Sequence, residues 1–395
     1  MNKWNIQRLE EIIQVNPTVK LTKGEAYPFI DIDKVSPTLR TVTNEALKSY
    51  DGQSCSKFCN GDTVFSRITP CLENRKIAQV SINGNGAFGS TEFYVFRAKE
   101  GLSDKDFVYY LTSSDAVVLP AINSMTGASG RQRADRRFIE KTKLCIPDVQ
   151  TQKRIADVLS TYDELIENNN KRIAILEQMA ENLYKEWFVR RKNSTWEYIR
   201  LSDFGYSLES GSRPKGGIDS SLQDGYPSLG AEAIGKLGEF DYSSTKLIPE
   251  DFYKKMKRGI GKDKDILLYK DGAYIGKVTL FMDEFPYKEY AINEHVFLMR
   301  SNDPTYQYYL YFTLALPQYF TQLQNLNRNA AQPGLTGKDI DILKLYRPDK
   351  ETVEKFNLVV EPMLHNIFSL AKQNQNLTKQ RDLLLPRLMS GKIEV

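Results

Sequence analysis

One stretch of the sequence decides the fold: residues 146–188, IPDVQTQKRIADVLSTYDELIENNNKRIAILEQMAENLYKEWF. Its apolar residues recur at alternating spacings of four and three, the pattern of a helix packed along a coiled-coil seam. About 38 residues, rising 1.5 Å each, make a helix of roughly 57 Å, which is longer than a small domain is wide. The overhanging apolar stripe therefore needs a second helix to cover it. The seam positions are Ile155, Leu159, Tyr162, Ile166, Asn169, Ile173, Leu176, Ala180, Leu183 and Trp187.

A second stretch near the C-terminus repeats this pattern: residues 347–388, RPDKETVEKFNLVVEPMLHNIFSLAKQNQNLTKQRDLLLPRL. Adding 201 to the seam numbers of the first helix gives the seam of the second, so the register is preserved. Pro362 is an irregularity, because a proline inside a helix removes a hydrogen bond. The sequence predicts either a kink at Pro362 or a helix that begins there. The second seam runs through Phe356, Val360, Met363, Ile367, Leu370, Asn374, Leu377, Arg381 and Leu384.

The segments that precede the two helices also resemble each other. Trp4 aligns with Trp196 at an offset of 192 residues, and Asp148 aligns with Asp349 at an offset of 201. The difference, 201 − 192 = 9, is an insertion in the second half. Further matches in the same order, such as STEFYVFR with INEHVFLMR, indicate a tandem duplication. The predicted domains are residues 1–145, a first globular domain; 146–192, a long helix; 193–346, a second globular domain; and 347–395, a second long helix.

Each globular segment is predicted to be an α/β domain. Short β-branched and aromatic runs bounded by Gly, Asn or Pro are typical of strands, and residues 103–118 and 304–320 are predicted to be helical. A domain–helix–domain–helix duplication with pseudo-twofold symmetry makes its two helices antiparallel. The predicted fold class is therefore α+β, with two α/β domains in tandem, each followed by a long helix, and the helices paired as an antiparallel coiled coil. The predicted strands are residues 63–67, 76–80, 92–97, 265–269, 278–281 and 295–300.

Each predicted seam contains one asparagine, Asn169 in the first helix and Asn374 in the second. A buried amide needs a hydrogen-bond partner, and it fixes the register of a coiled coil at some cost in stability. In an antiparallel register whose facing residue numbers sum to about 543, the two amides meet. We therefore predict that Asn169 and Asn374 satisfy each other.

The composition is that of a folded protein. Of the 395 residues, 41% are hydrophobic and 11% aromatic, enough for packed cores. No apolar run approaches the ~18 residues of a bilayer span, and the first residues lack the apolar core of a signal peptide, so a cytoplasmic protein is expected. Cys55, Cys59, Cys71 and Cys145 leave a zinc site open, but reduced, packed thiols are the simpler interpretation, and no metal is expected.

The long helices and strand entries resemble those of the DNA-specificity subunits of type I restriction–modification systems. The resemblance is carried by the helix after Ile146-Pro147, by its echo ending LLLPRLMSGKIEV, by GDTVFSR at residues 61–67, and by the W-x3-RL starts at Trp4 and Trp196. It implies two target recognition domains, each reading one half of a split sequence in double-stranded DNA. It also implies that the paired helices act as a ruler between them.

The same resemblance implies partner proteins. The helices would dock modification subunits, expected to number two, which bind S-adenosylmethionine and methylate adenine, and ATP-dependent restriction subunits would join the complex. No cofactor is expected on this chain itself, since S-adenosylmethionine, ATP and magnesium would be bound by the partner subunits.

The enzyme motifs in the chain are incomplete. Residues 84–89, GNGAFG, fit a dinucleotide-binding glycine pattern, but a predicted strand follows where a helix is required, so a hairpin turn is preferred. Residues 272–278, GAYIGKV, lack the hydroxyl that binds magnesium in a phosphate loop. His295 beside Glu294 has no Ser or Cys partner in view and is interpreted as structural. We predict no catalytic residues and a subunit that is not an enzyme.

Candidate DNA-binding residues come from polar loops near the predicted strands. The net charge of +4 is only mildly basic, but Lys and Arg concentrate in residues 130–143 and 253–270. Loops 124–133 and 327–337 occupy equivalent positions before the two long helices and are small and rich in Arg or amides. Such side chains read base edges and bind phosphates, although each of them is equally typical of a solvated surface. The candidates are Arg67, Arg75, Lys76, Arg131, Gln132, Arg133, Arg213, Lys215, Lys270, Lys277, Arg328, Asn329 and Gln332.

Two other functions stay open from the sequence alone. One is an assembly scaffold whose two domains bind protein partners and whose coiled coil spaces them. The other is a stand-alone nuclease. DNA binding by several Lys and Arg side chains weakens steeply with salt, which separates DNA recognition from the scaffold. A cleavage assay with magnesium and no partners tests the nuclease.

Overall fold

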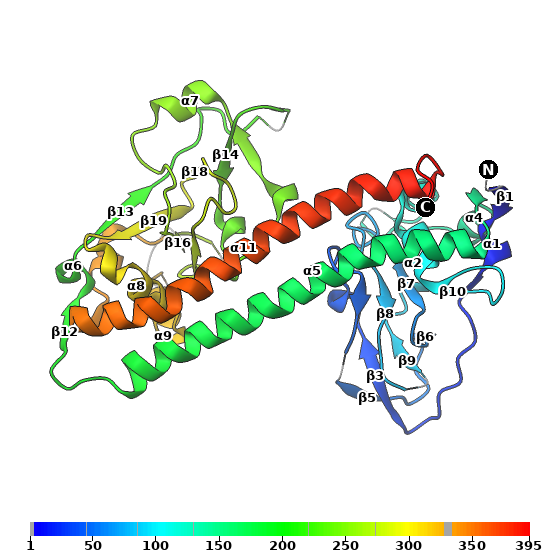
Figure 1. The fold of residues 1–395 in the computed structure, drawn as a ribbon, viewed down its shortest axis with the longest axis horizontal. Helices are drawn as coiled ribbons and strands as arrows, with labels where there is room; N and C mark the ends of the chain where they lie inside the picture. The colour runs from blue at the N-terminus through cyan, green and yellow to red at the C-terminus, as the bar shows by residue number, and fades with distance from the viewer. Residues whose placement is uncertain are drawn as a thin grey trace. The chain divides into compact units, whose positions relative to one another are not determined.

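The computed structural model describes residues 4–44, 46–84, 86–128, 130–219, 221–272, 274–327 and 334–395. The chain forms two compact units (Figure 1). Unit 1 comprises Met1–Glu167 and Asn376–Val395, and unit 2 comprises Asn168–Gln375. Each unit contains a globular part and a segment of both long helices. The domain boundaries expected from the sequence stay a prediction.

The globular part of unit 1 contains three sheets, of orders β2-β10-β7-β8-β4, β5-β3-β9-β6 and β1-β11. The strands are β1 (Asn5–Arg8), β2 (Ile13–Val15), β3 (Ala26–Ile30), β4 (Thr41–Val42), β5 (Leu47–Ser49), β6 (Ser56–Phe58), β7 (Thr63–Ser66), β8 (Ile77–Val80), β9 (Ala87–Gly89), β10 (Phe93–Ala98) and β11 (Lys143–Ile146). The helices are α1 (Leu9–Ile12), η1 (Ile32–Lys34), α2 (Lys105–Ser113), α3 (Asp115–Asn123) and α4 (Arg136–Glu140).

The central strands of the five-stranded sheet are covered on both faces. Every residue of β7 and β8 is buried, so their sequences do not alternate between polar and apolar. Helix α2 begins where the Asp104 side chain accepts hydrogen bonds from two backbone N–H groups. Its Phe107 then joins a core with Phe65 of β7 and with Ile155 and Leu388 of the two long helices. This packing anchors the recognition domain to the helices.

Unit 2 repeats this plan with sheets of orders β13-β19-β16-β17, β15-β14-β18 and β12-β20. The strands are β12 (Glu197–Arg200), β13 (Tyr206–Ser210), β14 (Tyr226–Leu229), β15 (Lys246–Ile248), β16 (Asp265–Tyr269), β17 (Val278–Phe281), β18 (Ala291–Ile292), β19 (Val296–Ser301) and β20 (Lys344–Arg347). The helices are α6 (Leu201–Phe204), η3 (Ala231–Ala233), η4 (Tyr242–Ser244), α7 (Glu250–Lys255), η5 (Pro304–Tyr306), α8 (Gln307–Leu314), α9 (Pro317–Asn327) and α10 (Gly337–Asp341).

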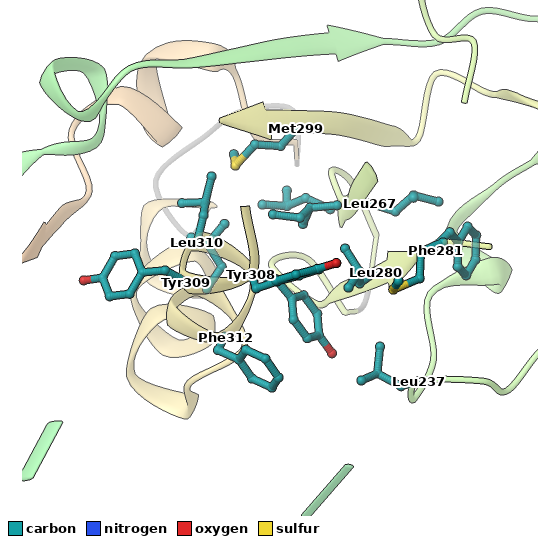
Figure 2. Close-up of a cluster of buried hydrophobic side chains, with 14 of the residues drawn as sticks. Leu237, Leu267, Leu280, Phe281, Met299, Tyr308, Tyr309, Leu310 and Phe312 are labelled. Atoms are coloured by element: carbon teal, nitrogen blue, oxygen red, sulfur yellow. The ribbon is translucent and has the colours of Figure 1, made fainter. Parts of the chain in front are cut away.

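The core of unit 2 lies between its main sheet and α8. Figure 2 shows Tyr308 and Leu310 of α8 next to Leu267 and Leu280, which belong to β16 and β17. All eight residues of α8 are buried, so this helix has no polar face. The strand order β13-β19-β16-β17 matches β2-β10-β7-β8 of unit 1. The tandem duplication inferred from the sequence is therefore repeated in the topology.

The six predicted strands are confirmed as β7, β8, β10, β16, β17 and β19, with bounds that shift by at most one residue at either end. The two predicted helices are each divided. Residues 103–118 contain α2 and the start of α3, because Ser114 is extended (φ −74°, ψ 158°). Residues 304–320 contain η5, α8 and the start of α9, which has Pro317 at its first position. The glycine-rich residues 84–89 run into strand β9, so the helix needed for dinucleotide binding is not there.

The two long helices, α5 (Val149–Tyr184) and α11 (Lys350–Met389), start in the same way. Asp148 accepts a hydrogen bond from the Thr151 backbone N–H at 2.9 Å, and Asp349 accepts one from that of Thr352 at 2.9 Å. A carboxylate before the first turn satisfies a helix N–H group that has no partner within the helix. The repeated Pro-Asp therefore specifies where each helix begins. A π-helical turn, Lys185–Arg190, follows α5.

The pairing of α5 and α11 is antiparallel in both units (Figure 1). In unit 2, the Asn169 Nδ2 donates to the Asn374 Oδ1 at 2.9 Å, and the rings of Tyr184 and Phe356 lie 6.1 Å apart. In unit 1, Arg381 pairs with Asp163 at 2.5 Å. Residue numbers rise along one helix as they fall along the other. The predicted antiparallel coiled coil and the meeting of the two asparagines are confirmed, and every predicted seam residue is buried or half-buried.

The seam contains one ion pair that the repeat does not share. Asp163 is buried, and it accepts hydrogen bonds from the Arg381 guanidinium and the Tyr110 hydroxyl. At the corresponding positions of the other helix stand Leu364 and Ala180, both fully buried. If the helices shifted in register, Asp163 or Arg381 would face an apolar residue and lose its counterion. The ion pair therefore favours the observed register.

Pro362 lies inside α11 and not at its start. The helix begins at Lys350, so the alternative that it begins at Pro362 is wrong, while the predicted kink stays a prediction. Continuous pairing of the turns on either side compensates for one missing hydrogen bond. Neither α5, nor α11, nor any shorter helix among the described residues has the length and apolar content needed to cross a membrane.

Replacing one seam asparagine tests the pairing. Asn374→Leu leaves the buried Asn169 amide without its partner, and we expect the free energy of unfolding to fall by about 1–3 kcal/mol. Asn374→Leu combined with Asn169→Leu restores most of that loss, because two leucines pack without an unpaired polar group. Denaturant unfolding measures the change, with Asn168→Leu at the exposed neighbouring position as the control. A double variant that is as unstable as the sum of the two single variants would contradict the pairing.

Candidate nucleic-acid interface

The first candidate residue, Arg67, directly follows β7. Its backbone N–H donates to the Glu92 carbonyl at 3.0 Å, and its Nε donates to the Glu92 Oε2 at 3.2 Å. The guanidinium carbon lies 5.3 Å from the centre of the Tyr94 ring. The strand end, an acid and an aromatic face therefore restrict the guanidinium together.

The loop before α4 follows the same strand end. The Thr69 N–H donates to the Gln132 carbonyl at 3.0 Å, and the Ala134 N–H donates to the Arg67 carbonyl at 2.8 Å. Arg133 lies between them, and it donates to both oxygens of Glu92, with distances of 2.9 Å from Nε and 2.5 Å from Nη2. Arg67, Glu92 and Arg133 form what we name the Glu92 cluster.

The Glu92 cluster carries two cations and one anion. The hydrogen bonds from Arg133 hold the pKa of the Glu92 carboxyl below its ordinary value, even though partial burial acts in the opposite direction. The carboxylate therefore stays ionised at neutral pH and the cluster has a net positive charge. The Arg133 side chain remains 46% exposed. Arg131 beside it is exposed, and Gln132 is half-buried.

Arg75 and Lys76 are not part of this cluster. Arg75 donates to the Ser113 carbonyl at 3.1 Å and pairs with Asp115, where α2 ends and α3 begins. Lys76 donates to the Ile32 carbonyl at 3.2 Å. The structure thus gives both cations partners within the protein, and their DNA contacts stay a prediction.

Unit 2 has an acid one residue before the position equivalent to Glu92. The strand registers of the two units differ by 203 residues, so His295 takes the place of Glu92 and Glu294 precedes it. The Arg213 Nε lies 2.6 Å from the Glu294 Oε1, and Arg213 remains 54% exposed. Both Glu294 carboxylate oxygens are out of reach of solvent and have no partner in hydrogen-bond geometry among the described residues, so Arg213 compensates this acid through charge alone. His295, next to it, pairs with Asp271 through Nδ1 and has its Nε2 3.5 Å from Glu294. Arg213, Glu294, His295 and Asp271 form what we name the Glu294 cluster.

Of the other second-half candidates, Lys270 is hydrogen-bonded to a member of this cluster. The Lys270 N–H donates to the His295 carbonyl at 2.9 Å, and its ammonium lies 5.1 Å from the Phe297 ring centre. Lys277 lies over the Tyr274 ring at 4.1 Å. Lys215 is exposed. Three further candidates, Arg328, Asn329 and Gln332, lie outside the described residues.

The acids Glu92, Glu294 and Asp271 are not among the site residues predicted from the sequence. The sequence repeat aligns Glu92 with Glu294, and this alignment is wrong by one residue, because the strand register pairs Glu92 with His295. Asp271 carried no comparable signal, because its pairing with His295 depends on the fold. Within the described ranges, no group of three or more His, Cys, Asp or Glu residues is placed to hold a metal ion.

The arrangement is suited to binding and reading an anionic polymer. Exposed guanidinium groups bind phosphates and pair with guanine edges, and a carboxylate behind them restricts their orientation. The same kind of cluster occurs once in each half of the chain.

Two segments of the chain, residues 1–178 and 193–362, match the model of the type I restriction modification DNA specificity domain. The chain belongs to this family. The MjaIX specificity subunit of Methanocaldococcus jannaschii, from a type I restriction enzyme, is 24% identical over 99% of this chain and 94% of its own. The HindI specificity subunit of Haemophilus influenzae is 23% identical over 88% of this chain and 90% of its own.

A solved structure has a similar fold. The type I restriction-modification system S subunit from M. genitalium matches 98% of this chain and 96% of its own, with a TM-score of 0.60 and 15% identity. At 15% identity, this similarity shows a shared fold only. The binding chemistry of the chain depends on its own residues.

Removing the two exposed arginines of the first loop tests the interface. Arg131→Ala with Arg133→Ala is expected to weaken DNA binding by the assembled complex about tenfold or more at physiological salt, since it removes two cations from the loop. Fluorescence anisotropy with labelled duplex measures the affinity. Lys20→Ala with Lys23→Ala, which removes the same charge from exposed positions of this domain outside the basic cluster of residues 130–143, is the control. Unchanged affinity in the loop variant would remove this loop from the interface.

Proposed function

We propose that this chain is the DNA-specificity subunit of a type I restriction–modification complex and that each recognition domain reads one half of a bipartite duplex target. The observation that carries the proposal is the repeated cluster. Glu92 and Glu294 lie within one residue of equivalent positions in two halves that both match the specificity-domain family, and each forms an ion pair with at least one exposed arginine. Two DNA-reading domains in one chain match a target that has two half-sites.

In this proposal the arginines of the two clusters read base edges. Arginine pairs with the O6 and N7 atoms of guanine through two parallel donors, the commonest specific contact in the major groove. Neighbouring exposed cations such as Arg131 and Lys215 bind phosphates and set the position of the domain. Binding therefore weakens steeply with salt, whereas an assembly scaffold without DNA readout would lack that dependence.

The long helices set the distance between the two half-sites. With 36 residues in α5 and 40 in α11, each helix is longer than about 34 Å, one turn of DNA. Domains separated by such a spacer meet one face of a duplex a turn or more apart. The bases between the half-sites are then not read.

The same helices offer equivalent positions for partner proteins. Val158 of α5 and Val359 of α11 are related by the offset of 201, and their exposed fractions are 37% and 41%. Equivalent exposed positions on a duplicated helix pair would accommodate two copies of one partner. We assign them to two modification subunits, which bind S-adenosylmethionine, while restriction subunits supply the chemistry that needs ATP and magnesium. The chain itself contributes recognition and no catalysis.

Exchanging one recognition domain tests the assignment of the half-sites. Replacing residues 1–145 with the corresponding segment of another family member is expected to change one half of the recognised sequence and to leave the other half and the gap as they were. Sequencing of duplexes selected by the purified complex measures this. The matched exchange of residues 193–346 should change the other half. If the first exchange left both halves unchanged, one domain would not read one half-site.

Charged substitutions on the helices test the partner sites. Val158→Asp and Val359→Asp are each expected to remove one modification subunit, and the double variant both, because an aspartate is costly to bury in an apolar contact. Mass photometry of the reconstituted complex counts the subunits. Gln178→Asp, exposed on the opposite side of α5 from Val158, is the control. Full occupancy in the double variant would exclude these positions from the contact.

A further inference from the structure

We propose that Glu92 and Glu294 are positioning residues for sequence readout: each carboxylate holds the guanidinium of a DNA-reading arginine in one orientation and opposes its use as a general phosphate-binding cation. The inference rests on the proposed function, which assigns these arginines to base edges. It adds a role for two acids at an interface where negative charge by itself disfavours DNA.

In the Glu92 cluster, some N–H donors of the two arginines are hydrogen-bonded to the carboxylate and others are not. Arg133 uses Nε and Nη2 on the carboxylate, and Arg67 uses Nε. The hydrogen bonds to Glu92 therefore leave donors on both guanidinium groups for an outside acceptor. An arginine has five N–H donors in a rigid fork, so holding one edge determines where the others point.

Glu92 is itself anchored. Its backbone N–H donates to the Ser90 hydroxyl at 3.2 Å, and its carbonyl accepts the Arg67 N–H at 3.0 Å. Its side chain is 20% exposed, against 46% for Arg133. The acid lies behind the arginines and not in front of them, so it orients them without covering them.

In the Glu294 cluster a carboxylate also lies beside an exposed arginine, but the other partners differ. The Arg213 Nε lies 2.6 Å from the Glu294 Oε1 in an ion pair without hydrogen-bond geometry, and both carboxylate oxygens are shielded from solvent. A desolvated carboxylate is costly without a counterion, so it favours one position of Arg213. His295, held by Asp271 on its other nitrogen, closes the remaining side. Two differently built clusters that share only the acid and an exposed arginine indicate that the acid is the common requirement.

A carboxylate in this place affects two kinds of binding in opposite directions. On nonspecific DNA, where contacts are to phosphates, the negative charge repels and competes for the arginine. On the specific site, a guanidinium already in its bound orientation loses less conformational entropy, so affinity is gained. The net effect is a larger ratio of specific to nonspecific affinity.

Glu92→Gln tests the proposal because it keeps the shape of the side chain and removes its charge. In the assembled complex, affinity for the specific duplex is expected to fall and affinity for a duplex of scrambled sequence to rise. Their ratio should fall about tenfold, the order of one bidentate base contact. Selection from random duplexes should show relaxed base preference in the half-site read by the first domain only. Glu294→Gln should relax the other half-site only.

The possible outcomes distinguish a failure of the positioning role from a failure of the proposed function. Wild-type complex that binds all sequences equally would overturn the proposed function. Wild type that is specific, together with a Glu92→Gln variant of unchanged ratio, would overturn the positioning role alone. A fall in both affinities would indicate a structural role and also overturn it. Glu73→Gln, at an exposed acid of the same domain that forms no ion pair within the described part of the chain, provides the matched loss of charge and should leave the ratio unchanged.

Discussion

The mutual burial of the two helical stripes is the interaction on which the rest of the structure depends. Neither α5 nor α11 could remain extended in water with its seam exposed, and each covers the other in an antiparallel register. Their ends also enter the cores of the globular parts, through Ile155 and Leu388 in unit 1 and through Phe356 in unit 2. The helices are therefore parts of the globular cores as well as of the helix pair.

The register of this seam is specified by polar groups as well as by apolar packing. Asn169 and Asn374 satisfy each other in unit 2, while Asp163 and Arg381 pair in unit 1. A slip along the seam would leave buried amides and charges without partners, which costs more than the loss of apolar contact alone. A single register gives the helix pair one geometry. The proposed function requires this, because the helix pair would set the distance between the two half-sites.

The sequence was most informative where one local rule dominates. Buried β-branched runs predicted β7, β8, β10, β16, β17 and β19, and the repeated period predicted the helix pair. Ser114 divides a predicted helix because it is the N-cap residue of α3, with Asp115 in the first turn, a local signal that the prediction of one continuous helix did not use. Pro362 shows the reverse case, since packing keeps α11 continuous through a residue that locally disfavours it.

The candidate interface was less accessible to sequence reasoning, because it depends on which loop meets which strand end. Arg67 and Arg133 were identified by type and place, but the carboxylate that joins them lies 25 residues from one of them along the chain. Arg75 has the same chemistry and is paired with Asp115 instead. The sequence alignment of Glu92 with Glu294 indicated an acid near this strand in both halves, although the strand register shifts the second acid by one residue.

Mapping methylated adenines in the genome of a host that carries the complex tests the central claim most directly. The account predicts two short specified blocks separated by a gap of fixed length and unspecified sequence, with modification in each block. A single uninterrupted motif, or two blocks at variable spacing, would contradict a chain that reads DNA with two domains held by one ruler.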